Sequence, residues 1–332
     1  MKPKIAIIGC GGTVSTIARD GLDFIEYPET GRKMEPSEVV ERMGDLLSFV
    51  DVECIAFRAV GSSAIGPAEW VQLANQIDEL AATRPDIHGV LILHGTGSLE
   101  ETAYFLDLSL AGNLPVALTG AQRPFNAVGA DAQTNILSAI RALTDARLAG
   151  CGVVVVMNDE IHQARDVTKT STYRLNAFRS PDCGPLAVVD ADRIEIMRLS
   201  TRPHMGQTPF SAPRDVADLA RIDIAYAYAG ADGVVVDAFV AAGASGIVSA
   251  GFSPGIPPKS QRAALEKAAA AGVIVVQSNR GGSGRVGHRS YLEGHGFIAA
   301  GDLNPQKARI LLMLSLCLTR DPHALQEFFD TF

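Results

Sequence analysis

Residues 89–102, Gly-Val-Leu-Ile-Leu-His-Gly-Thr-Gly-Ser-Leu-Glu-Glu-Thr, decide the fold class because they hold a complete passage from a strand into a helix. The apolar run Gly89–Leu93 has the length of a strand and is too short for most helices. A short polar turn follows. The helical pattern over Leu99–Leu110 then opens with Glu100 and Glu101, whose charges suit the positive end of a helix dipole. A buried strand that turns directly into a helix is typical of α/β folds.

The same unit recurs on both sides of this stretch. Further runs of strand length are Ile5–Ile8, Val52–Phe57, Pro115–Thr119, Gly152–Met157, Ile222–Tyr228, Gly246–Ser249 and Val273–Gln277. Helical patterns lie between them at Pro67–Ala82, Asp131–Leu148, Lys259–Ala271 and Pro305–Cys317. Most of the strand runs are continuously apolar, as in parallel sheets whose two faces are both covered. The order predicts a doubly wound α/β architecture.

The length of 332 residues exceeds one typical core and predicts two domains. The segment Thr201–Arg214 contains three prolines and has the composition of an interdomain linker. We therefore expect a larger N-terminal α/β domain at 1–205, a linker at 206–218 and a smaller C-terminal α/β domain at 219–332.

Composition excludes several classes of protein. The formal charge is −8 and no basic cluster is visible, so we expect no nucleic-acid partner. No apolar stretch reaches the roughly 20 residues of a membrane span, and Ile5–Ile8 is too short for a signal-peptide core. The widely spaced cysteines show no CxxC pair, which favours reduced thiols over a metal site. These cysteines are Cys10, Cys54, Cys151, Cys183 and Cys317. We expect a cytoplasmic protein that does not bind membranes.

Residues 9–16 form the first of four polar clusters that follow predicted strands, where ligands bind in open parallel sheets. Glycines let the backbone turn sharply and expose the hydroxyl of Thr13, so this threonine is a candidate nucleophile if a base is near. The alternative is a nucleotide-binding turn. Gly9 and Gly11 fit the start of G-x-G-x-x-G, although Val14 occupies the third glycine position.

The second and third clusters follow the next predicted strands. Residues 60–63, Val-Gly-Ser-Ser, indicate on their own only a turn. Between His94 and Thr102, backbone N–H groups at a helix start could hold a carboxylate or an oxyanion. His94 could serve as a base or a metal ligand. No second ligand stands at metal-binding spacing, so a hydrogen-bonded residue at a strand end is the favoured interpretation.

The fourth cluster runs from Met157 to Thr170 and contains Lys169 among short polar residues. Burial would lower the pKa of this lysine because the charged form is disfavoured away from water. A lysine of that kind is a candidate general base. A surface lysine is the alternative interpretation.

Together the four clusters resemble the signatures of the bacterial-type L-asparaginase/glutaminase family, and the resemblance spans nearly the whole chain. The matching blocks, in order, are Gly11–Thr13, His94–Thr96 with Glu100–Leu106, Thr119–Pro124 with Gly129–Asp131, Met157–Asp159 with Asp166–Thr170, Gly246–Gly251, and Leu303–Arg309. Six ordered blocks are far more specific than any one of them. The resemblance implies a two-domain asparaginase-like fold, with a larger N-terminal, mostly parallel sheet flanked by helices and a smaller C-terminal flavodoxin-like α/β domain.

The resemblance also implies roles for individual residues. Thr13 would be the nucleophile that forms an acyl-enzyme, and Tyr27 would lie near its hydroxyl. Thr96 and Lys169 would form a second polar pair that activates a water or tunes the nucleophile. Ser62 would bind the substrate carboxylate. The rest of the predicted substrate-binding set is Gly12, Ser63, Gly95 and Gly97.

The family resemblance further implies a small-molecule amide substrate, no metal and no organic cofactor. It implies a homotetramer, a pair of tight dimers, in which the smaller domain of a neighbour completes each site.

The sequence departs from the family pattern at two of these positions. Gly97 stands where the family normally has an aspartate that pairs with the catalytic lysine and holds the α-ammonium of the substrate. Ser63 stands where asparaginases commonly have glutamine. Loss of one partner from a buried ion pair leaves on the order of 3–5 kcal/mol uncompensated, so Lys169 is either neutral or paired with another carboxylate.

We therefore hypothesise an active amidohydrolase whose specificity is altered away from free L-asparagine, toward amides or related acyl compounds without a free α-ammonium. The main alternative is an L-asparaginase proper. A non-catalytic homologue that binds a small molecule and a dinucleotide-binding protein are two further alternatives.

Overall fold

The structure is a computed structural model that describes residues 2–213 and 215–332. The chain divides into two compact units, Met1–Gln207 and Thr208–Phe332. This division falls within the linker predicted at 206–218, of which residue 214 lies outside the described residues. No helix in the described part of the chain is both long enough and apolar enough to cross a membrane.

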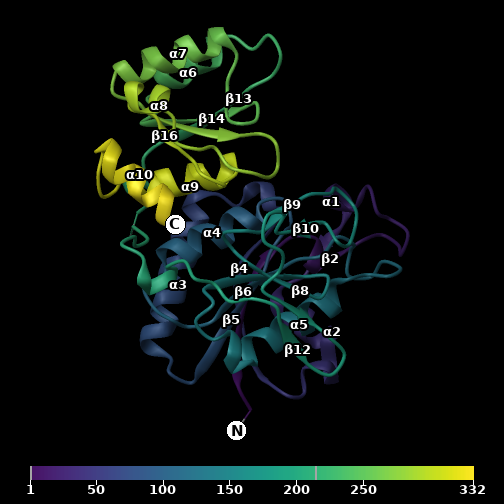
Figure 1. Ribbon diagram of the computed structural model, residues 1–332. Coiled ribbons are helices and arrows are strands. Elements are labelled where there is room, and N and C mark those ends of the chain that lie inside the picture. Colours follow the sequence, from purple (N-terminus) through teal and green to yellow (C-terminus); the bar gives the residue numbers. More distant parts are fainter. Residues whose placement is uncertain (1, 214) are drawn as a thin grey trace. The chain divides into compact units, whose positions relative to one another are not determined.

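The first unit is built on one eight-stranded sheet with the order β12-β11-β8-β7-β6-β5-β1-β4 (Figure 1). The five strands from β7 to β4 are parallel, and β8, β11 and β12 extend the sheet in antiparallel fashion. Their bounds are β1 Lys4–Gly11, β4 Asp51–Val60, β5 Ile87–Leu93, β6 Val116–Thr119, β7 Val153–Met157, β8 Glu160–Gln163, β11 Ala187–Val189 and β12 Ile194–Ile196. Two short ribbons accompany the sheet: β2 Thr16–Ile17 with β3 Arg32–Lys33, and β9 Thr168–Lys169 with β10 Phe178–Arg179.

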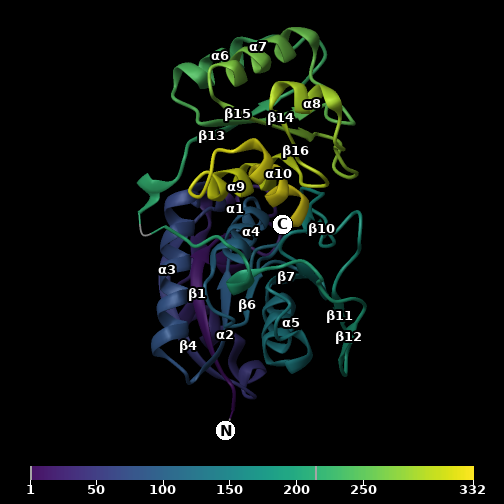
Figure 2. The ribbon, with the colours of Figure 1, turned by 60° about the vertical axis from the view of Figure 1, so that its left-hand side comes forward.

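Helices cover both faces of this sheet, as the continuously apolar strands predict. Figure 2 shows α3 and α5 on opposite sides of the strands. Side chains of α2 and α5 share one buried core with β1, β5 and β7, whereas α3 packs with α4. The helix bounds are α1 Tyr27–Thr30, α2 Pro36–Met43, α3 Pro67–Thr83, α4 Leu99–Ser109 and α5 Ala132–Thr144.

The parallel order places several chain turns at one edge of the sheet. Because β1 lies between β4 and β5, the turns that follow these three strands are neighbours at the carboxyl edge. The polar sequence after β7 forms a tight hairpin into β8, since Asn158 and Asp159 have φ of 52° and 60°. The fourth polar cluster therefore begins with a turn, and Lys169 lies further along the chain in β9.

The second unit contains a four-stranded parallel sheet with the order β13-β14-β15-β16 (Figure 1). Its strands are β13 Ile222–Tyr226, β14 Gly246–Gly251, β15 Ile274–Asn279 and β16 Ile298–Ala299. Its helices are α6 Val234–Ala241, α7 Lys259–Ala270, α8 Ser290–His295, α9 Pro305–Ser315 and α10 Pro322–Thr331. Helices α6 and α7 contribute to the same buried core as β14 and β15. The predicted two-domain α/β fold is thus confirmed.

Candidate active site

Two glycine turns meet at the carboxyl edge of the sheet in the first unit. Gly12 has a φ of +80°, which glycine adopts readily, and a Cβ at this position would lie 2.2 Å from the Cα of Gly95. A Cβ on Gly95 would in turn lie 2.8 Å from the Cβ of Ser62. Side chains at either glycine would separate the turns. The contact therefore brings Thr13 and Thr96, the residues that follow the two glycines, to neighbouring positions.

Thr13 is the first residue of a short 3-10 helix, Thr13–Ser15, and its side chain is partly exposed. Its hydroxyl oxygen lies 3.1 Å from the hydroxyl oxygen of Tyr27, which begins α1. Either group can donate this hydrogen bond. The Thr16 hydroxyl donates to the Gly12 carbonyl at 2.8 Å and so fixes the turn that presents Thr13.

Thr96 and Lys169 form a second polar contact. The side-chain nitrogen of Lys169 donates to the hydroxyl of Thr96 at 2.7 Å. Burial lowers the pKa of Lys169 from 10.5, because the half-buried ammonium loses hydration, and the negative charge of Glu100 opposes part of this shift. A lysine that gives up its proton more readily than usual, and that contacts a hydroxyl, is suited to general-base work.

The hydroxyl of Ser62 lies beside Gly97, the position at which the family pattern has an aspartate. A Cβ at Gly97 would be 2.7 Å from the Ser62 hydroxyl oxygen. The backbone N–H of Gly97 donates to that oxygen at 3.1 Å, so the serine proton stays available for a ligand. Ser98 donates to the Ser62 carbonyl at 2.7 Å and holds this turn against α4. Ser63 is exposed.

His94 is structural. Its side chain is fully buried, and burial lowers its pKa to about 4, so the ring is neutral at pH 7. Nδ1 lies 2.8 Å from the Gly95 carbonyl, and Nε2 lies 3.0 Å from the Thr102 hydroxyl. Trp70 donates its indole N–H to the same hydroxyl at 2.9 Å. This chain of hydrogen bonds orients the Gly95 carbonyl and agrees with the interpretation of His94 as a hydrogen-bonded residue at a strand end.

Glu100 is a site residue to which the sequence reasoning gave no role beyond the start of a helix. It lies in the first turn of α4, is nearly buried, and its Oε2 accepts the backbone N–H of Lys169 at 2.6 Å. The sequence signals were its place at the start of a predicted helix and in the block Glu100–Leu106 that matches the family. Nothing in the spacing could show that it reaches β9, which is 69 residues away along the chain.

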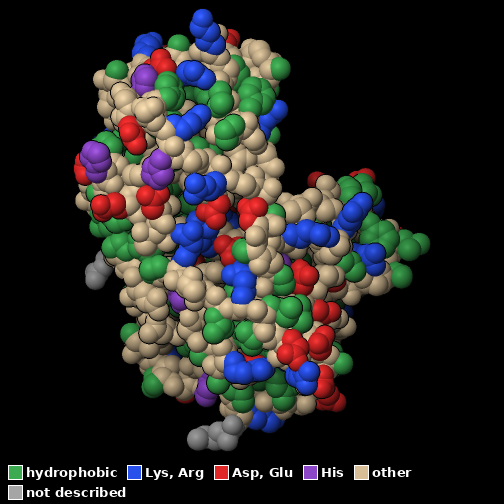
Figure 3. Space-filling view, in the orientation of Figure 1, with side chains coloured by type: hydrophobic (Ala, Val, Ile, Leu, Met, Phe, Trp, Pro, Cys, Tyr) green, Lys and Arg blue, Asp and Glu red, His purple; other side chains and the backbone are tan. Residues whose placement is uncertain are grey.

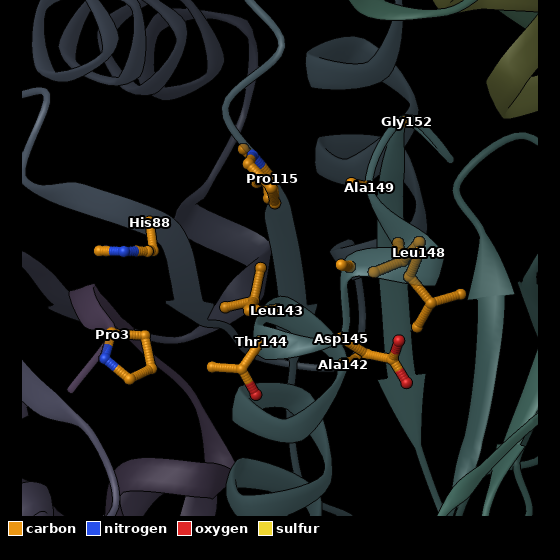
Figure 4. Close-up of a pocket in the computed structure, with 13 residues that line it drawn as sticks. Pro3, His88, Pro115, Ala142, Leu143, Thr144, Asp145, Leu148, Ala149 and Gly152 are labelled. Carbon is orange, nitrogen blue, oxygen red and sulfur yellow. The ribbon is translucent and has the colours of Figure 1, made fainter. Parts of the chain in front are cut away.

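The opposite, amino edge of the same sheet has a hollow of about 230 Å³, which Figure 4 shows from within. Its lining is mostly apolar and includes Pro115, Leu143 and Leu148, together with the polar residues His88 and Asp145. None of the predicted site residues lines it.

Charged side chains of both signs are interspersed on the face of the molecule in Figure 3. Within residues 2–213 and 215–332, no group of three or more His, Cys, Asp or Glu side chains is arranged to hold a metal ion.

Comparison with known proteins gives concordant results for both units. The family described as "Asparaginase, N-terminal" matches residues 4–202, and "Glutaminase/Asparaginase C-terminal domain" matches residues 221–329. An L-asparaginase 2 of Escherichia coli is 36% identical over 332 residues, which cover 99% of this chain and 93% of the relative. A glutaminase-asparaginase of Pseudomonas fluorescens is 32% identical, with 98% and 90% of the two chains covered. A crystal structure of a probable cytoplasmic L-asparaginase from Campylobacter jejuni superposes with a TM-score of 0.94 at 35% identity and full coverage of both chains.

Proposed function

Since this chain belongs to the asparaginase/glutaminase family and is therefore an amidohydrolase, we propose that it hydrolyses the side-chain amide of L-asparagine, with the hydroxyl of Thr13 as the nucleophile. The choice of L-asparagine as the substrate rests on the names of the relatives, which are L-asparaginases and glutaminase-asparaginases. They agree better with an asparaginase proper than with the altered specificity that the sequence led us to favour.

The proposed reaction has two steps, the formation of an ester on Thr13 and the hydrolysis of that ester. Thr13 Oγ1 attacks the amide carbon, the carbon–nitrogen bond breaks, and the hydroxyl proton leaves on the nitrogen as ammonia. A water then attacks the ester on Thr13, the carbon–oxygen bond to Thr13 breaks, and the threonine regains a proton as L-aspartate forms. Tyr27, whose hydroxyl oxygen lies 3.1 Å from that of Thr13, would exchange a proton with it. Lys169, with its lowered pKa, would accept a proton from the attacking water through Thr96.

One observation carries this proposal: the two threonines, each hydrogen-bonded to a group that can move a proton, follow two glycines that touch. Replacement of Thr13 tests it. We expect Thr13→Ala to lower kcat at least about 1000-fold and Thr13→Ser to keep measurable turnover, because a hydroxyl remains.

The matched control is Thr30→Ala, which removes a hydroxyl that donates to the Glu26 carbonyl just before α1, and it should leave activity unchanged. Ammonia release from L-asparagine is the measurement. Full ammonia release by Thr13→Ala would exclude Thr13 as the nucleophile. A Thr13→Ala variant that releases no ammonia but keeps the full biological effect would favour a protein whose function is binding and not catalysis.

Gly97 favours a second candidate function, hydrolysis of an amide without a free α-ammonium. No carboxylate stands at this position, and Ser62 offers a hydroxyl donor suited to a carboxylate oxygen. Comparison of kcat/KM for L-asparagine and for succinamate, the same compound without its amine, separates the two candidates. A clear preference for L-asparagine supports the asparaginase, and a preference for succinamate supports the second candidate.

The Gly97→Asp variant sharpens this comparison. Gly97 has no positive φ, and the hydroxyl of Ser62 can rotate away from a new Cβ, so the turn can accept a side chain. If the enzyme is an asparaginase proper, its existing groups already hold the α-ammonium, and activity on L-asparagine changes little. If specificity is altered, the new carboxylate raises kcat/KM for L-asparagine relative to succinamate.

The homotetramer, built as a pair of dimers, is proposed on the family resemblance. Light scattering during size-exclusion chromatography tests it, and a monomeric enzyme with full activity would contradict a site completed by a neighbour. Cytoplasmic location also stays a prediction, since the relatives include both a probable periplasmic enzyme of Haemophilus influenzae and the probable cytoplasmic enzyme of Campylobacter jejuni.

A further inference from the structure

Lys169 is held at two points by one segment of the chain. Thr96 contacts its side-chain nitrogen at 2.7 Å, and Glu100 accepts its backbone N–H at 2.6 Å. We infer that Glu100 is a positioning residue that aligns Lys169 with Thr96 and supplies the negative charge for this lysine, in place of a carboxylate at Gly97. This inference rests on the proposed function of Lys169 as a proton acceptor.

The local structure around Lys169 needs such an anchor. The strand β9 has two residues and pairs only with β10, also of two residues, where Lys169 lies opposite Phe178. A two-residue ribbon has little stability of its own. The backbone N–H of Thr170, the residue after Lys169, donates to the Ala177 carbonyl at 2.7 Å and adds one hydrogen bond next to the ribbon. Glu100 holds the lysine itself.

Thr96 and Glu100 belong to a rigid part of the fold. Thr96 lies in the turn between β5 and α4, and Glu100 lies in the first turn of α4, a helix whose residues are almost all buried. The positive end of the helix dipole stabilises a carboxylate at that position. Because Thr96 and Glu100 are both buried and lie only four residues apart, a displacement of Lys169 would break both contacts together.

The charge of Glu100 acts on Lys169 from this position. Burial lowers the pKa of the lysine, and Glu100 is the charged group in the described residues whose field raises it. Three charged residues that lie close to β9 and β10 along the chain are paired with other groups or exposed. Asp166 pairs with Arg198 at 2.7 Å, Arg165 lies 3.7 Å from Asp166, and Arg179 on β10 is exposed. The site therefore contains a carboxylate for its lysine although residue 97 is glycine.

The test measures the pKa of Lys169 directly, by the pH dependence of its acetylation with acetic anhydride, read peptide by peptide in a mass spectrometer. Glu100→Gln keeps an acceptor for the Lys169 N–H and removes the charge. We expect its labelling curve to move to lower pH by about one unit, which raises the acetylation rate near neutral pH about tenfold. The pH profile of kcat/KM should move in the same direction. Glu101→Gln, a neighbouring charge removal on α4, is the matched control and should leave both curves in place.

Glu100→Asp separates position from charge, since it keeps the carboxylate but shortens its reach. We expect a labelling curve close to that of the wild type and a fall of roughly tenfold in kcat with little change in KM. An unmoved labelling curve in Glu100→Gln, an equal movement in Glu101→Gln, or a wild-type kcat in Glu100→Asp would each overturn the inference. If the wild-type enzyme releases no ammonia from any amide, the proposed function fails, whereas the labelling curves still decide the relation between Glu100 and Lys169.

Discussion

The amino and carboxyl edges of the sheet in the first unit each have a histidine and a lysine, but these residues differ between the edges in their burial and their contacts. Strand β5 has a histidine near each end: His88 at the amino edge is exposed, and His94 just beyond the carboxyl edge is fully buried and neutral. Each edge also has a lysine. Lys4 contacts Asp86 at 2.8 Å, and this hydrogen bond raises its pKa. Lys169 contacts a hydroxyl, and burial lowers its pKa.

This contrast indicates that the side chains at an edge of the sheet, and not the presence of a hollow, identify the functional edge. The hollow lined by Leu143 and Leu148 belongs to the amino edge, where the charged groups are paired and reach solvent. At the carboxyl edge, close glycine contacts leave little room for side chains but set hydroxyls and a lysine of lowered pKa together. Perturbed groups of that kind are typical of functional sites.

We expect the largest effect from replacing one glycine at each edge by alanine, Gly12 at the carboxyl edge and Gly150 at the amino edge. Gly12 and Gly150 both have positive φ, +80° and +83°. A Cβ at Gly12 would strike the backbone of Gly95, whereas a Cβ at Gly150 meets no described atom within 4 Å. We expect Gly12→Ala to lower the free energy of unfolding by roughly 3 kcal/mol or more and to abolish activity, and Gly150→Ala to cost only about 1–2 kcal/mol of backbone strain.

Urea denaturation of the two variants makes this comparison. Equal losses of stability would mean that the contact between the glycine turns does not constrain the carboxyl edge, and the placement of Thr13 beside Thr96 would lose its basis.

The two lysines give the next largest effect. Removal of a general base lowers the rate by roughly 100-fold or more, so Lys169→Met should reduce kcat/KM for L-asparagine by that factor. Lys4→Met should keep activity within about twofold, because its partner Asp86 is exposed and far from the candidate site in the fold. The measurement is the steady-state kinetics of both variants. Normal activity of Lys169→Met would contradict the functional difference between the lysines of the two edges.

The two histidines give a smaller effect that depends on pH. An unfolded histidine binds a proton near pH 6.5, but buried His94 does so only near pH 4, so the unfolded state binds more protons between these values. The stability that His94 contributes by staying neutral is therefore lost as pH falls through this window, by about 2 kcal/mol between pH 7 and pH 5.

The measurement is the free energy of unfolding at both pH values for the wild type, His94→Gln and His88→Gln. We expect His94→Gln to lack this part of the acid destabilisation and His88→Gln to retain it. The same pH dependence in all three proteins would show that His94 is not held neutral by its buried position.

Most of the fold was predictable from the sequence because continuously apolar strands and helix starts are local signals. All the predicted strands and helices are present, with ends shifted by a few residues. Among the helices of the described residues, α1, α2, α6, α8 and α10 were not predicted. The sequence of α6, Val-Val-Val-Asp-Ala-Phe-Val-Ala, is rich in β-branched residues, and packing against α7 and the sheet overrides their preference for strands. The short strands β8, β11 and β12 were missed because all three are brief and because β8 and β12 also contain polar residues.

The candidate site was predictable only in part. The glycine turns and their threonines stand in recognisable blocks, and the pairing of Thr96 with Lys169 follows the family resemblance. The link from Glu100 to the backbone of Lys169, and the chain from Trp70 through Thr102 to His94, join residues that are distant along the sequence. Such contacts depend on the packing of α3, α4 and β9 and leave no pattern in the sequence.

In the proposed mechanism the hydroxyl of Thr13, at the carboxyl edge, receives the acyl group of the substrate. To detect this intermediate, the enzyme is mixed with L-asparagine for milliseconds and quenched in acid, and its peptides are mapped by mass spectrometry. We expect an aspartyl ester on the peptide that contains Thr13, the same ester on the serine of Thr13→Ser, and no ester on this peptide in Thr13→Ala. An adduct on another residue, or rapid turnover by Thr13→Ala, would contradict this mechanism.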